Sequence, residues 1–350
     1  MTSTGAQMKG KRGLVLAVIV SAACITAACG RYSSTPASAG PSQSAAAVAY
    51  AMPPGRQAAA MAYDPEMRKV VMFGGGTIST PLNDTWAWDG KGWTDLHPAT
   101  TPAGSAASMV YDTADHQLVL DTSGQLGSSI WTWKNGDWVL LRTYPARTCE
   151  KLAGGGVSCS PPLATSPEGF ESAVYDAALG KLVAQDRLDT WAGDGLNWTR
   201  LGSLDDTLGN CFCIAYDSVT RQLVTLAFSG GKSAPAIGHT LVLGQAGWMR
   251  SQAVTPVVTQ ALIVDDPAAS ILLMLSVNEN YGSPQPEQMW SWNGSSWTQI
   301  KVSLPPLLNG SSISYDAGHK QVVLYGGIDV SGTAYSDTWT WDGKSWQKRV

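Results

Sequence analysis

A ten-residue phrase that ends in Trp recurs six times along the chain, and this repetition constrains the fold more than any other feature. The first copy runs from Asp84 to Trp93 and carries two further indoles, Trp86 and Trp88. The other copies end at Trp138, Trp198, Trp248, Trp297 and Trp346. A phrase that recurs roughly every 50 residues is typical of an array of similar units rather than of one irregular core.

A second phrase precedes each Trp phrase: an apolar segment that ends in Tyr-Asp (Val-Asp in one copy), a short polar turn and another apolar run. The pairs are Tyr63-Asp64, Tyr111-Asp112, Tyr175-Asp176, Tyr216-Asp217, Val264-Asp265 and Tyr315-Asp316. The runs that follow, such as residues 70–73, are rich in β-branched and aromatic residues and predict strands. Trp86 and Trp88 alternate with Ala87, which places both indoles on one face of a strand. Each unit therefore holds four short strands, here named a to d in chain order.

The four-strand unit cannot be stable alone, because an isolated sheet of this size leaves both faces in water. Radial stacking of such sheets gives a β-propeller. The sequence thus predicts an all-β fold in which residues 55–350 form a six-bladed propeller of four-stranded antiparallel blades. Regular spacing places the repeated Trp residues between blades, so we expect them to be core residues rather than a sugar-stacking surface.

The repeats resemble those of the kelch-repeat β-propellers, a family that includes the central domain of galactose oxidase. The resemblance covers residues 55–348 and lies in the small apolar strand a, the diglycine after strand b, the aromatic residue of strand c and the Trp of strand d. The diglycine is intact at Gly74-Gly75 and Gly326-Gly327, comes later at Gly230-Gly231, and is missing from blades two, three and five. Galactose oxidase binds copper with tyrosines and histidines and uses a domain beyond its propeller. The sequence here ends in the last blade, so we carry none of that chemistry over and expect no cofactor and no metal site.

The first 28 residues have the order of a bacterial signal peptide. Lys9, Lys11 and Arg12 are positive, and residues 14–20 are apolar but shorter than the roughly 20 residues that a bilayer span needs. Small residues then precede Cys29. This order resembles a lipobox, which implies that Cys29 is lipidated and anchors the protein to the outer face of the bacterial cytoplasmic membrane.

Three details of this segment leave alternatives open. Thr26 is a weaker match than the Leu usual at that position, so ordinary signal-peptide cleavage is one alternative. Cys24 is a poorer second lipidation site, and Met8 is a second candidate start. Residues 29–54 are rich in Ser, Pro, Ala and Gly and carry almost no charge, which predicts a flexible tether.

The formal net charge is −4, and residues 1–28 contribute only basic residues, so their removal leaves a more acidic chain. An acidic protein without a basic stripe is a poor nucleic-acid binder. We therefore expect a membrane attachment through the lipid and no nucleic-acid partner.

Four cysteines follow Cys29, and export favours disulfides among them. Cys149 and Cys159 lie together in an inserted loop, and we predict that they pair. Cys211 and Cys213 lie on the same side of a strand, where a bond between them would be strained. They pair with the inserted loop or are small core thiols, and the sequence does not choose.

The meander order assigns the connections to two faces. The a–b and c–d turns emerge on one face, the turn face, and are short and repetitive. The b–c and d–a connections emerge on the other, the loop face, and are long and varied. Recognition usually resides in variable loops on a rigid scaffold. The loops of the loop face carry these candidate binding residues outside the repeat: Tyr144, Arg147, Lys232, Tyr281 and Tyr335.

These observations predict an exported, lipid-anchored binding module that recognises a glycan or a protein partner through the loop face. The alternative is an extracytoplasmic carbohydrate-active hydrolase or lyase. That activity would need an acid–base pair of carboxylates converging over the central channel. The sequence singles out no catalytic residue.

Overall fold

The computed structural model describes residues 50–349, apart from 125–126, 146–148, 152–156, 160–165, 168, 187, 231–236, 257, 259 and 278–286. At residues 105–107, 149–151, 157–159, 210–212 and 277 it describes the backbone alone. The described residues belong to one compact unit, Val48–Val350. The predicted signal peptide, Cys29 and the first part of the predicted tether lie outside them.

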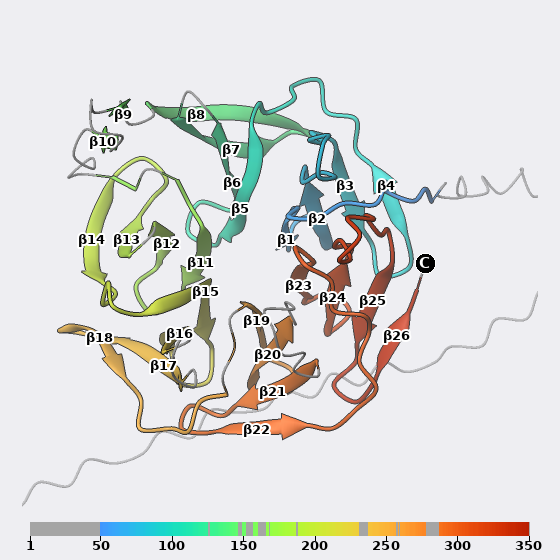
Figure 1. Ribbon diagram of the computed structural model, residues 1–350. Coiled ribbons are helices and arrows are strands. Elements are labelled where there is room, and N and C mark those ends of the chain that lie inside the picture. Colours follow the sequence, from blue (N-terminus) through green and yellow to red (C-terminus); the bar gives the residue numbers. More distant parts are fainter. Residues whose placement is uncertain are drawn as a thin grey trace, which may run out of the picture. The chain divides into compact units, whose positions relative to one another are not determined.

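Six four-stranded antiparallel sheets form a ring, as the sequence predicts (Figure 1). Each blade consists of four consecutive strands, so no strand from one end of the chain completes a blade at the other end. The described residues contain no helix, and hence none long and apolar enough to cross a membrane. The blades are β1 (Ala60–Asp64), β2 (Lys69–Phe73), β3 (Thr85–Trp88) and β4 (Trp93–Asp95); β5 (Ser105–Asp112), β6 (Gln117–Gly124), β7 (Gly127–Lys134) and β8 (Asp137–Pro145); β11 (Ser172–Asp176), β12 (Lys181–Asp186), β13 (Asp189–Gly193) and β14 (Trp198–Ser203); β15 (Gly209–Asp217), β16 (Gln222–Ser229), β17 (Ile237–Gly244) and β18 (Gly247–Arg250); β19 (Gln260–Asp266), β20 (Ile271–Val277), β21 (Gln288–Trp292) and β22 (Trp297–Ile300); and β23 (Ser312–Asp316), β24 (Gln321–Tyr325), β25 (Thr338–Trp341) and β26 (Trp346–Lys348). A hairpin of β9 (Cys149–Lys151) and β10 (Val157–Cys159) follows blade two.

The acidic residue that ends strand a caps the a–b turn in every blade. In blade one, Asp64 Oδ1 accepts hydrogen bonds from the backbone N–H groups of Glu66 (2.8 Å) and Met67 (3.0 Å). Short polar side chains stabilise turns in this way because they occupy N–H groups that no strand partner reaches. The same cap is made by Asp112, Asp176, Asp217, Asp266 and Asp316.

Blade five corrects the sequence alignment by one residue. Asp266, not Asp265, makes the cap, and it pairs across the hairpin with Ile271 just as Asp64 pairs with Lys69. Asp265 therefore stands where the other blades have Tyr. Its Oδ1 accepts the Ser218 N–H (3.3 Å), and burial raises its pKa to about 6. The sequence pattern failed here because Asp265 and Asp266 are adjacent and either satisfies the phrase.

Apolar side chains from the central two strands of each blade fill the seams between blades. On strand b, alternate residues face the preceding and the following blade, as Val70 and Val71 do in blade one. The fifth residue of strand b faces the following blade. It is apolar or aromatic in four blades (Phe73, Leu226, Leu275 and Tyr325), but Asp121 in blade two and Gln185 in blade three. Asp121 and Gln185 are fully buried, so these two seams contain polar groups that the others lack.

The repeated Trp of strand d packs between its own blade and the preceding one, and in most blades it links them by a hydrogen bond. In four blades its indole N–H donates to a Thr hydroxyl on the preceding blade, at 2.7–2.9 Å; the pairs are Trp93–Thr338, Trp138–Thr85, Trp248–Thr190 and Trp297–Thr240. In blade six, Trp346 donates to Met289 Sδ (3.4 Å) instead. In blade three the matching position is Ile130, which has no acceptor, and the Trp198 N–H makes no hydrogen bond with any described residue. The predicted place of these Trp residues between blades is confirmed.

We expect a double-mutant cycle to detect the hydrogen bond between Trp138 and Thr85. Thr85→Val keeps the shape but leaves the buried Trp138 N–H unpaired, so the free energy of unfolding should fall by roughly 1–2 kcal/mol. Combined with Trp138→Phe, the cycle should give a coupling of about 1 kcal/mol between the two positions. The matched cycle of Ile130→Val with Trp198→Phe should give a coupling near zero. Equal couplings at the two seams would show that packing alone holds the Trp residues in place.

The N-terminal end of the described chain closes the ring between blades six and one. Ala51 pairs with Trp93, Pro53 is buried, and the Pro53 carbonyl accepts the Tyr325 hydroxyl (2.7 Å). Farther along, the Ala58 N–H donates to Gly310 O (2.6 Å). We call residues 50–58 the N-terminal strap. The packed part of the chain therefore begins by Tyr50, inside the range predicted as tether, because Pro53 and the residues around it find partners on two blades.

Arg56 is the anchor of the strap. Its guanidinium is buried and binds the Asp84 carboxylate with two hydrogen bonds (2.6 and 2.8 Å), and it also donates to Gly74 O (2.9 Å) and Pro54 O (3.0 Å). Partial burial acts to raise the pKa of Asp84, but hydrogen bonds from Arg56 and Trp86 outweigh it and hold that pKa below its ordinary value. One side chain thus joins the strap to both ends of the b–c loop of blade one.

Candidate functional site: the loop face and the central channel

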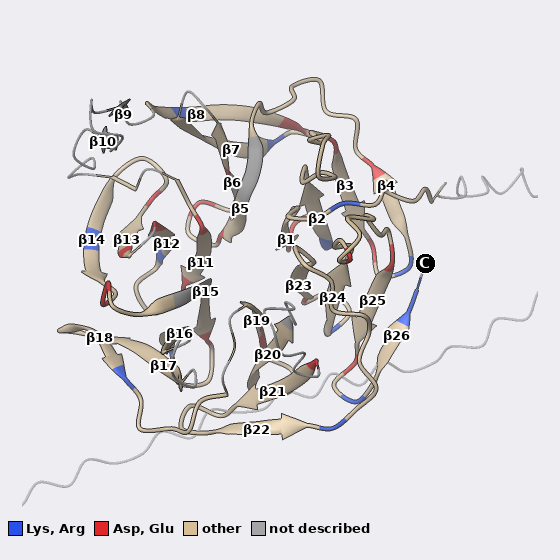
Figure 2. Cartoon of the chain, viewed as in Figure 1, with Lys and Arg blue, Asp and Glu red and all other residues tan. Residues whose placement is uncertain are grey.

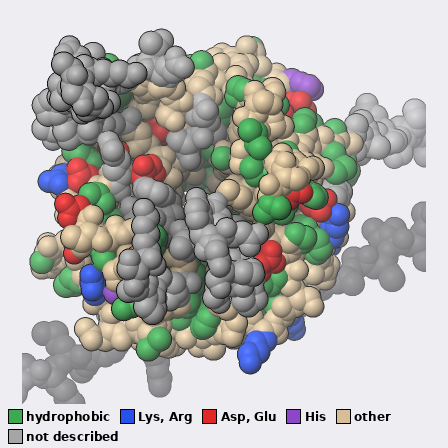
Figure 3. All heavy atoms as spheres, in the orientation of Figure 1, with side chains coloured by type: hydrophobic (Ala, Val, Ile, Leu, Met, Phe, Trp, Pro, Cys, Tyr) green, Lys and Arg blue, Asp and Glu red, His purple; other side chains and the backbone are tan. Residues whose placement is uncertain are grey.

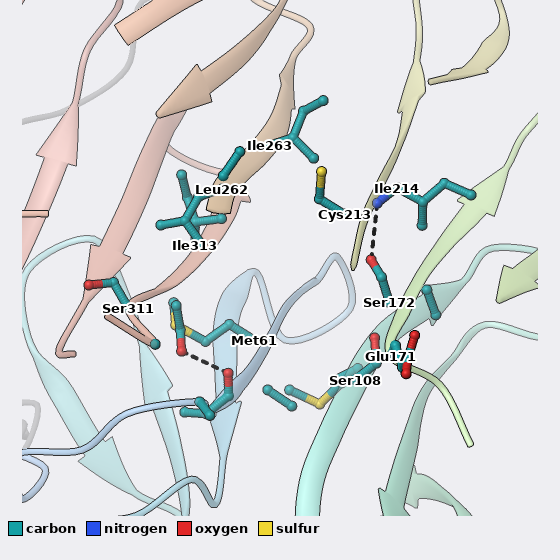
Figure 4. Close-up of a pocket in the computed structure, with 18 residues that line it drawn as sticks. Met61, Ser108, Glu171, Ser172, Cys213, Ile214, Leu262, Ile263, Ser311 and Ile313 are labelled. Atoms are coloured by element: carbon teal, nitrogen blue, oxygen red, sulfur yellow. Dashed lines mark hydrogen bonds between the residues drawn. The ribbon is translucent and has the colours of Figure 1, made fainter. Parts of the chain in front are cut away.

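Residues of all six strands a surround a central cavity of about 310 Å³ (Figure 4). Its lining is mostly small and apolar, with Met61, Ile214 and Ile263 among the larger side chains, and several serine hydroxyls. Two of these hydroxyls link neighbouring blades: Ser172 Oγ accepts the Ile214 N–H (3.2 Å), and Ser312 Oγ donates to Ala59 O (2.7 Å). The cavity is thus part of the ring's framework as well as an opening.

Glu171 is the one carboxylate among the described residues that line this cavity. A glycosidase-type mechanism needs two carboxyl groups facing the scissile bond. The described lining therefore does not supply the acid–base pair that the enzymatic alternative requires. The described residues also contain no group of three His, Cys, Asp or Glu side chains arranged to hold a metal ion.

Three exposed apolar side chains lie on the b–c loops of blades one and six, and we call them the apolar patch. Ile78 is 69% exposed, Val330 is 91% exposed and Tyr335 is 37% exposed. The two loops touch, since a Cβ added at Gly332 would collide with Ile78 Cδ1. Figure 3 shows this face, with hydrophobic side chains over the region of blades one and six. The patch therefore crosses the same seam that the strap closes.

Hydrogen bonds fix the shape of the loop that carries Val330 and Tyr335. Asp329 Oδ1 accepts the N–H groups of Ser331 (2.9 Å) and Thr333 (3.0 Å), and Oδ2 accepts the Tyr335 hydroxyl (3.0 Å). These bonds hold the pKa of Asp329 below its ordinary value, chiefly through the Ser331 hydroxyl. An ionised carboxylate therefore lies beside the apolar patch.

A small dent of about 40 Å³ adjoins the patch. It is lined by Pro306, Leu308, Leu324, Gly326, Tyr335, Asp337 and Trp339. Asp337 forms an ion pair with Lys348 (2.9 Å), while aromatic and aliphatic carbon forms the remaining walls. The dent has room for the end of one apolar side chain rather than for a whole small-molecule ligand.

The structure corrects the assignment of Tyr144 as a surface binding residue. Strand β8 extends to Pro145, so Tyr144 pairs with Ser128 inside the sheet, and its side chain is only 4% exposed. The Arg142 guanidinium lies 5.1 Å from the centre of its ring. Burial raises the pKa of Tyr144, and nearby Trp198 acts to lower it. The Tyr144 hydroxyl makes no hydrogen bond of ordinary geometry with any described residue.

Of the other four candidate residues, the structure describes only Tyr335, and it places this side chain on the exposed patch. Arg147, Lys232 and Tyr281 lie outside the described residues, so their grouping stays a prediction. Ile78 and Val330 were missed by the sequence reasoning, which searched the loops for aromatic and charged residues only. Their signal was available: both are β-branched apolar residues flanked by polar residues in these loops.

The inserted hairpin brings the backbones of Cys149 and Cys159 opposite each other in register. Their side chains lie outside the described part of the structure, so the predicted disulfide stays a prediction. Cys213 is buried beside the channel and is disulfide-bonded, which excludes its alternative as a free core thiol. Its partner is not among the side chains that the structure describes.

Asp121 is a buried acid that the sequence reasoning did not single out. Its Oδ2 accepts the Phe170 N–H (2.9 Å), and its Oδ1 has no hydrogen-bond partner among the described residues. Burial raises the pKa of Asp121 to about 7; the charge of Asp186 acts in the same direction and the Phe170 N–H acts against it. Below about pH 7 the protonated form of Asp121 is therefore favoured at the seam between blades two and three.

Charged side chains are spread over the ring. Figure 2 shows Lys and Arg scattered among the blades rather than gathered into a stripe. The basic side chains of Arg56 and Arg200 are each engaged by a carboxylate, Asp84 and Asp189 respectively. This distribution does not resemble the clustered basic surface of a nucleic-acid-binding protein.

The chain is similar to several solved structures at low sequence identity. No family model and no curated protein matches the sequence. Among solved structures, a putative gluconolactonase is 12% identical (TM-score 0.46; 85% of this chain and 90% of that chain covered). TolB from Acinetobacter baumannii is also 12% identical (TM-score 0.41; 83% and 66%), and the β-propeller domain of the Trilobed protease from Pyrococcus furiosus is 8% identical (TM-score 0.40; 84% and 83%). These likenesses concern the six-bladed propeller fold, and membership of the kelch family stays a prediction.

Proposed function

We propose that this protein is an exported, lipid-anchored binding module that takes a protein partner on its loop face. The observation that carries the proposal is the apolar patch of Ile78, Val330 and Tyr335, which is exposed on hydrogen-bonded loops of two adjoining blades. Apolar side chains held in a fixed arrangement favour association, because little conformational entropy is lost when a partner covers them.

The chemistry of the patch favours a protein over a glycan. Sugar recognition in this fold would use aromatic faces, and of the two candidate tyrosines that the structure describes, Tyr144 lies in the core. Ile78 and Val330 offer branched aliphatic surface, which complements apolar side chains. The dent beside Tyr335 provides a socket for one such side chain, and aromatic residues at the edge of a socket are common hot spots of protein interfaces.

A pair of patch substitutions tests this proposal. In the full chain, Ile78→Ser with Val330→Ser should weaken affinity for the partner about 30- to 900-fold, since each hot-spot side chain contributes on the order of 1–2 kcal/mol. Thermal stability should change little, because both side chains are exposed. The measurement is a titration of the purified partner, once it has been recovered by covalent cross-linking to the loop face in cells.

The matched control uses the turn face. Leu179 and Val219 are each 50% exposed there, and changing both to Ser removes apolar surface of the same kind, although less of it than the patch substitutions remove. This control should leave affinity within about twofold of the original value. An equal loss of affinity from both pairs would contradict the assignment of binding to the loop face, and turnover of a glycan by the unaltered protein would favour the hydrolase or lyase alternative.

A further inference from the structure

The N-terminal strap begins on the turn face. The Tyr50 hydroxyl donates to Asp89 Oδ2 (2.8 Å), and the Ala51 N–H donates to Trp93 O (3.0 Å). Asp89 and Trp93 flank the c–d turn of blade one, between β3 and β4. A Cβ added at Gly92 would collide with the Tyr50 ring, so this ring lies directly against the turn. The chain therefore joins the propeller at a turn-face edge of blade one.

The strap then crosses the seam and ends on the loop face. Arg56 binds Asp84 and Gly74, which are the two ends of the b–c loop of blade one. The Arg56 N–H also donates to Tyr335 O (3.2 Å), and the Gly327 N–H donates to Arg56 O (2.7 Å), both on the b–c loop of blade six. Figure 1 shows this segment running from the rim beside β4 inward across blade one to β1. Contacts at both ends thus fix the direction in which the chain arrives.

We propose that the strap orients the anchored protein, so that the turn face lies toward the membrane and the loop face with its apolar patch points away from it. The proposal rests on the lipid anchor at Cys29 that forms part of the proposed function. It also uses the place where residues 50–58 bind the blades and the length of the chain that precedes them. A chain that joins the propeller at the turn face must pass around the rim before the loop face can approach the bilayer.

The chain between Cys29 and the strap is short enough to favour the orientation with the turn face toward the membrane. Residues 30–49 form a stretch that is rich in Ser, Ala and Gly. The sequence predicts a flexible tether here, and a flexible chain of about 20 residues has a root-mean-square span of roughly 25 Å. A folded domain of about 300 residues has a radius of gyration near 19 Å, so its full width exceeds that span. Turning the loop face to the membrane would require an extended tether, which is entropically unfavourable.

Depth-dependent fluorescence quenching tests the orientation in the full, lipidated chain. A fluorophore is attached to a cysteine introduced at Lys344→Cys on the turn face or at Val330→Cys on the loop face, and the protein is placed on vesicles that contain brominated lipids. Both positions are exposed. We expect the turn-face probe to be quenched at least threefold more than the loop-face probe. Equal quenching, or stronger quenching at Val330→Cys, would overturn the proposal.

Two further variants separate the strap from the anchor. Tyr50→Ala with Ala51→Pro removes both turn-face hydrogen bonds of the strap but leaves Arg56 in place, and it should reduce the difference between the probes. Cys29→Ser should release the protein from the vesicles altogether. Failure of the unaltered chain to bind vesicles would overturn both the anchor and the orientation, whereas partner binding by the apolar patch is measured separately and would stand.

Discussion

Replacing Arg56 with Ala should lower the free energy of unfolding by roughly 3 kcal/mol, because it leaves the partly buried Asp84 carboxylate without its partner. The variant also loses the bonds to Gly74 O and Pro54 O, which hold the strap in the seam. For a domain of this size the melting temperature should fall by about 5–10 °C. Thermal unfolding followed by the fluorescence of the buried Trp residues provides the measurement.

Arg200 supplies the matched control for Arg56. It also pairs with a carboxylate, Asp189, at 2.6 Å, but its side chain is 53% exposed. Exposed ion pairs contribute little, so Arg200→Ala should change stability by less than about 1 kcal/mol. Arg56→Lys should lie between wild type and Arg56→Ala, because Lys keeps the charge but cannot bind the carboxylate with a planar fork. Equal effects of the two Ala variants would mean that the strap does not close the ring.

Replacing Asp121 with Asn should stabilise the protein at pH 8 by roughly 4 kcal/mol, which corresponds to a pKa raised by about three units. Asn keeps the shape and the acceptor for the Phe170 N–H, but it carries no charge into the seam. Chemical unfolding at pH 4 and at pH 8 measures the effect. At pH 4 the two proteins should differ little, since Asp121 is protonated in the folded state at that pH.

The direction of the pH dependence follows from whether the folded or the unfolded protein holds the Asp121 proton more tightly. The raised pKa means that folded Asp121 keeps its proton up to about pH 7, whereas the unfolded carboxyl loses it near pH 4. Stability is therefore fully present below about pH 4 and is lost as the pH rises toward 7. Asp265, with its pKa raised to about 6, adds a loss in the same direction.

Asp342→Asn supplies a control that should change stability at neutral pH in the opposite direction. Backbone N–H groups of Ser345 and Lys344 donate to the Asp342 carboxylate and hold its pKa below the ordinary value, so its stabilising effect is present above the unfolded pKa and is lost on acidification. This variant should weaken the protein at neutral pH. A pH profile that is unchanged in Asp121→Asn would show that Asp121 is not the buried acid that titrates.

The repeat predicted the fold because each of its residues has a local physical task. The Trp of strand d needs a buried seam, and the Asp at the end of strand a needs turn N–H groups, so six copies fixed six blades. The register of blade five could not be predicted in the same way. The repeat has one Asp at the end of strand a, whereas blade five has two adjacent ones, Asp265 and Asp266. Only the pairing of Asp266 with Ile271 decides between them.

The candidate site was harder to predict because it depends on contacts between distant parts of the chain. Tyr144 looks like a loop residue in the sequence, yet β8 continues far enough to bury it. Arg56 looks like one arginine among several scattered ones, and its role appears only when the strap meets blades one and six. Ile78 and Val330 are far apart in sequence and become neighbours only because the ring closes at their seam.

Site-specific photo-cross-linking in cells tests the central claim, binding of a protein partner through the loop face, most directly. A photoreactive amino acid is placed at Val330 or Ile78 on the loop face, and at Lys344 or Leu179 on the turn face; all four side chains are exposed. We expect one discrete protein adduct, shared by the two loop-face positions and missing from both turn-face positions. The same adduct from the turn-face positions, with none from Val330 or Ile78, would contradict it.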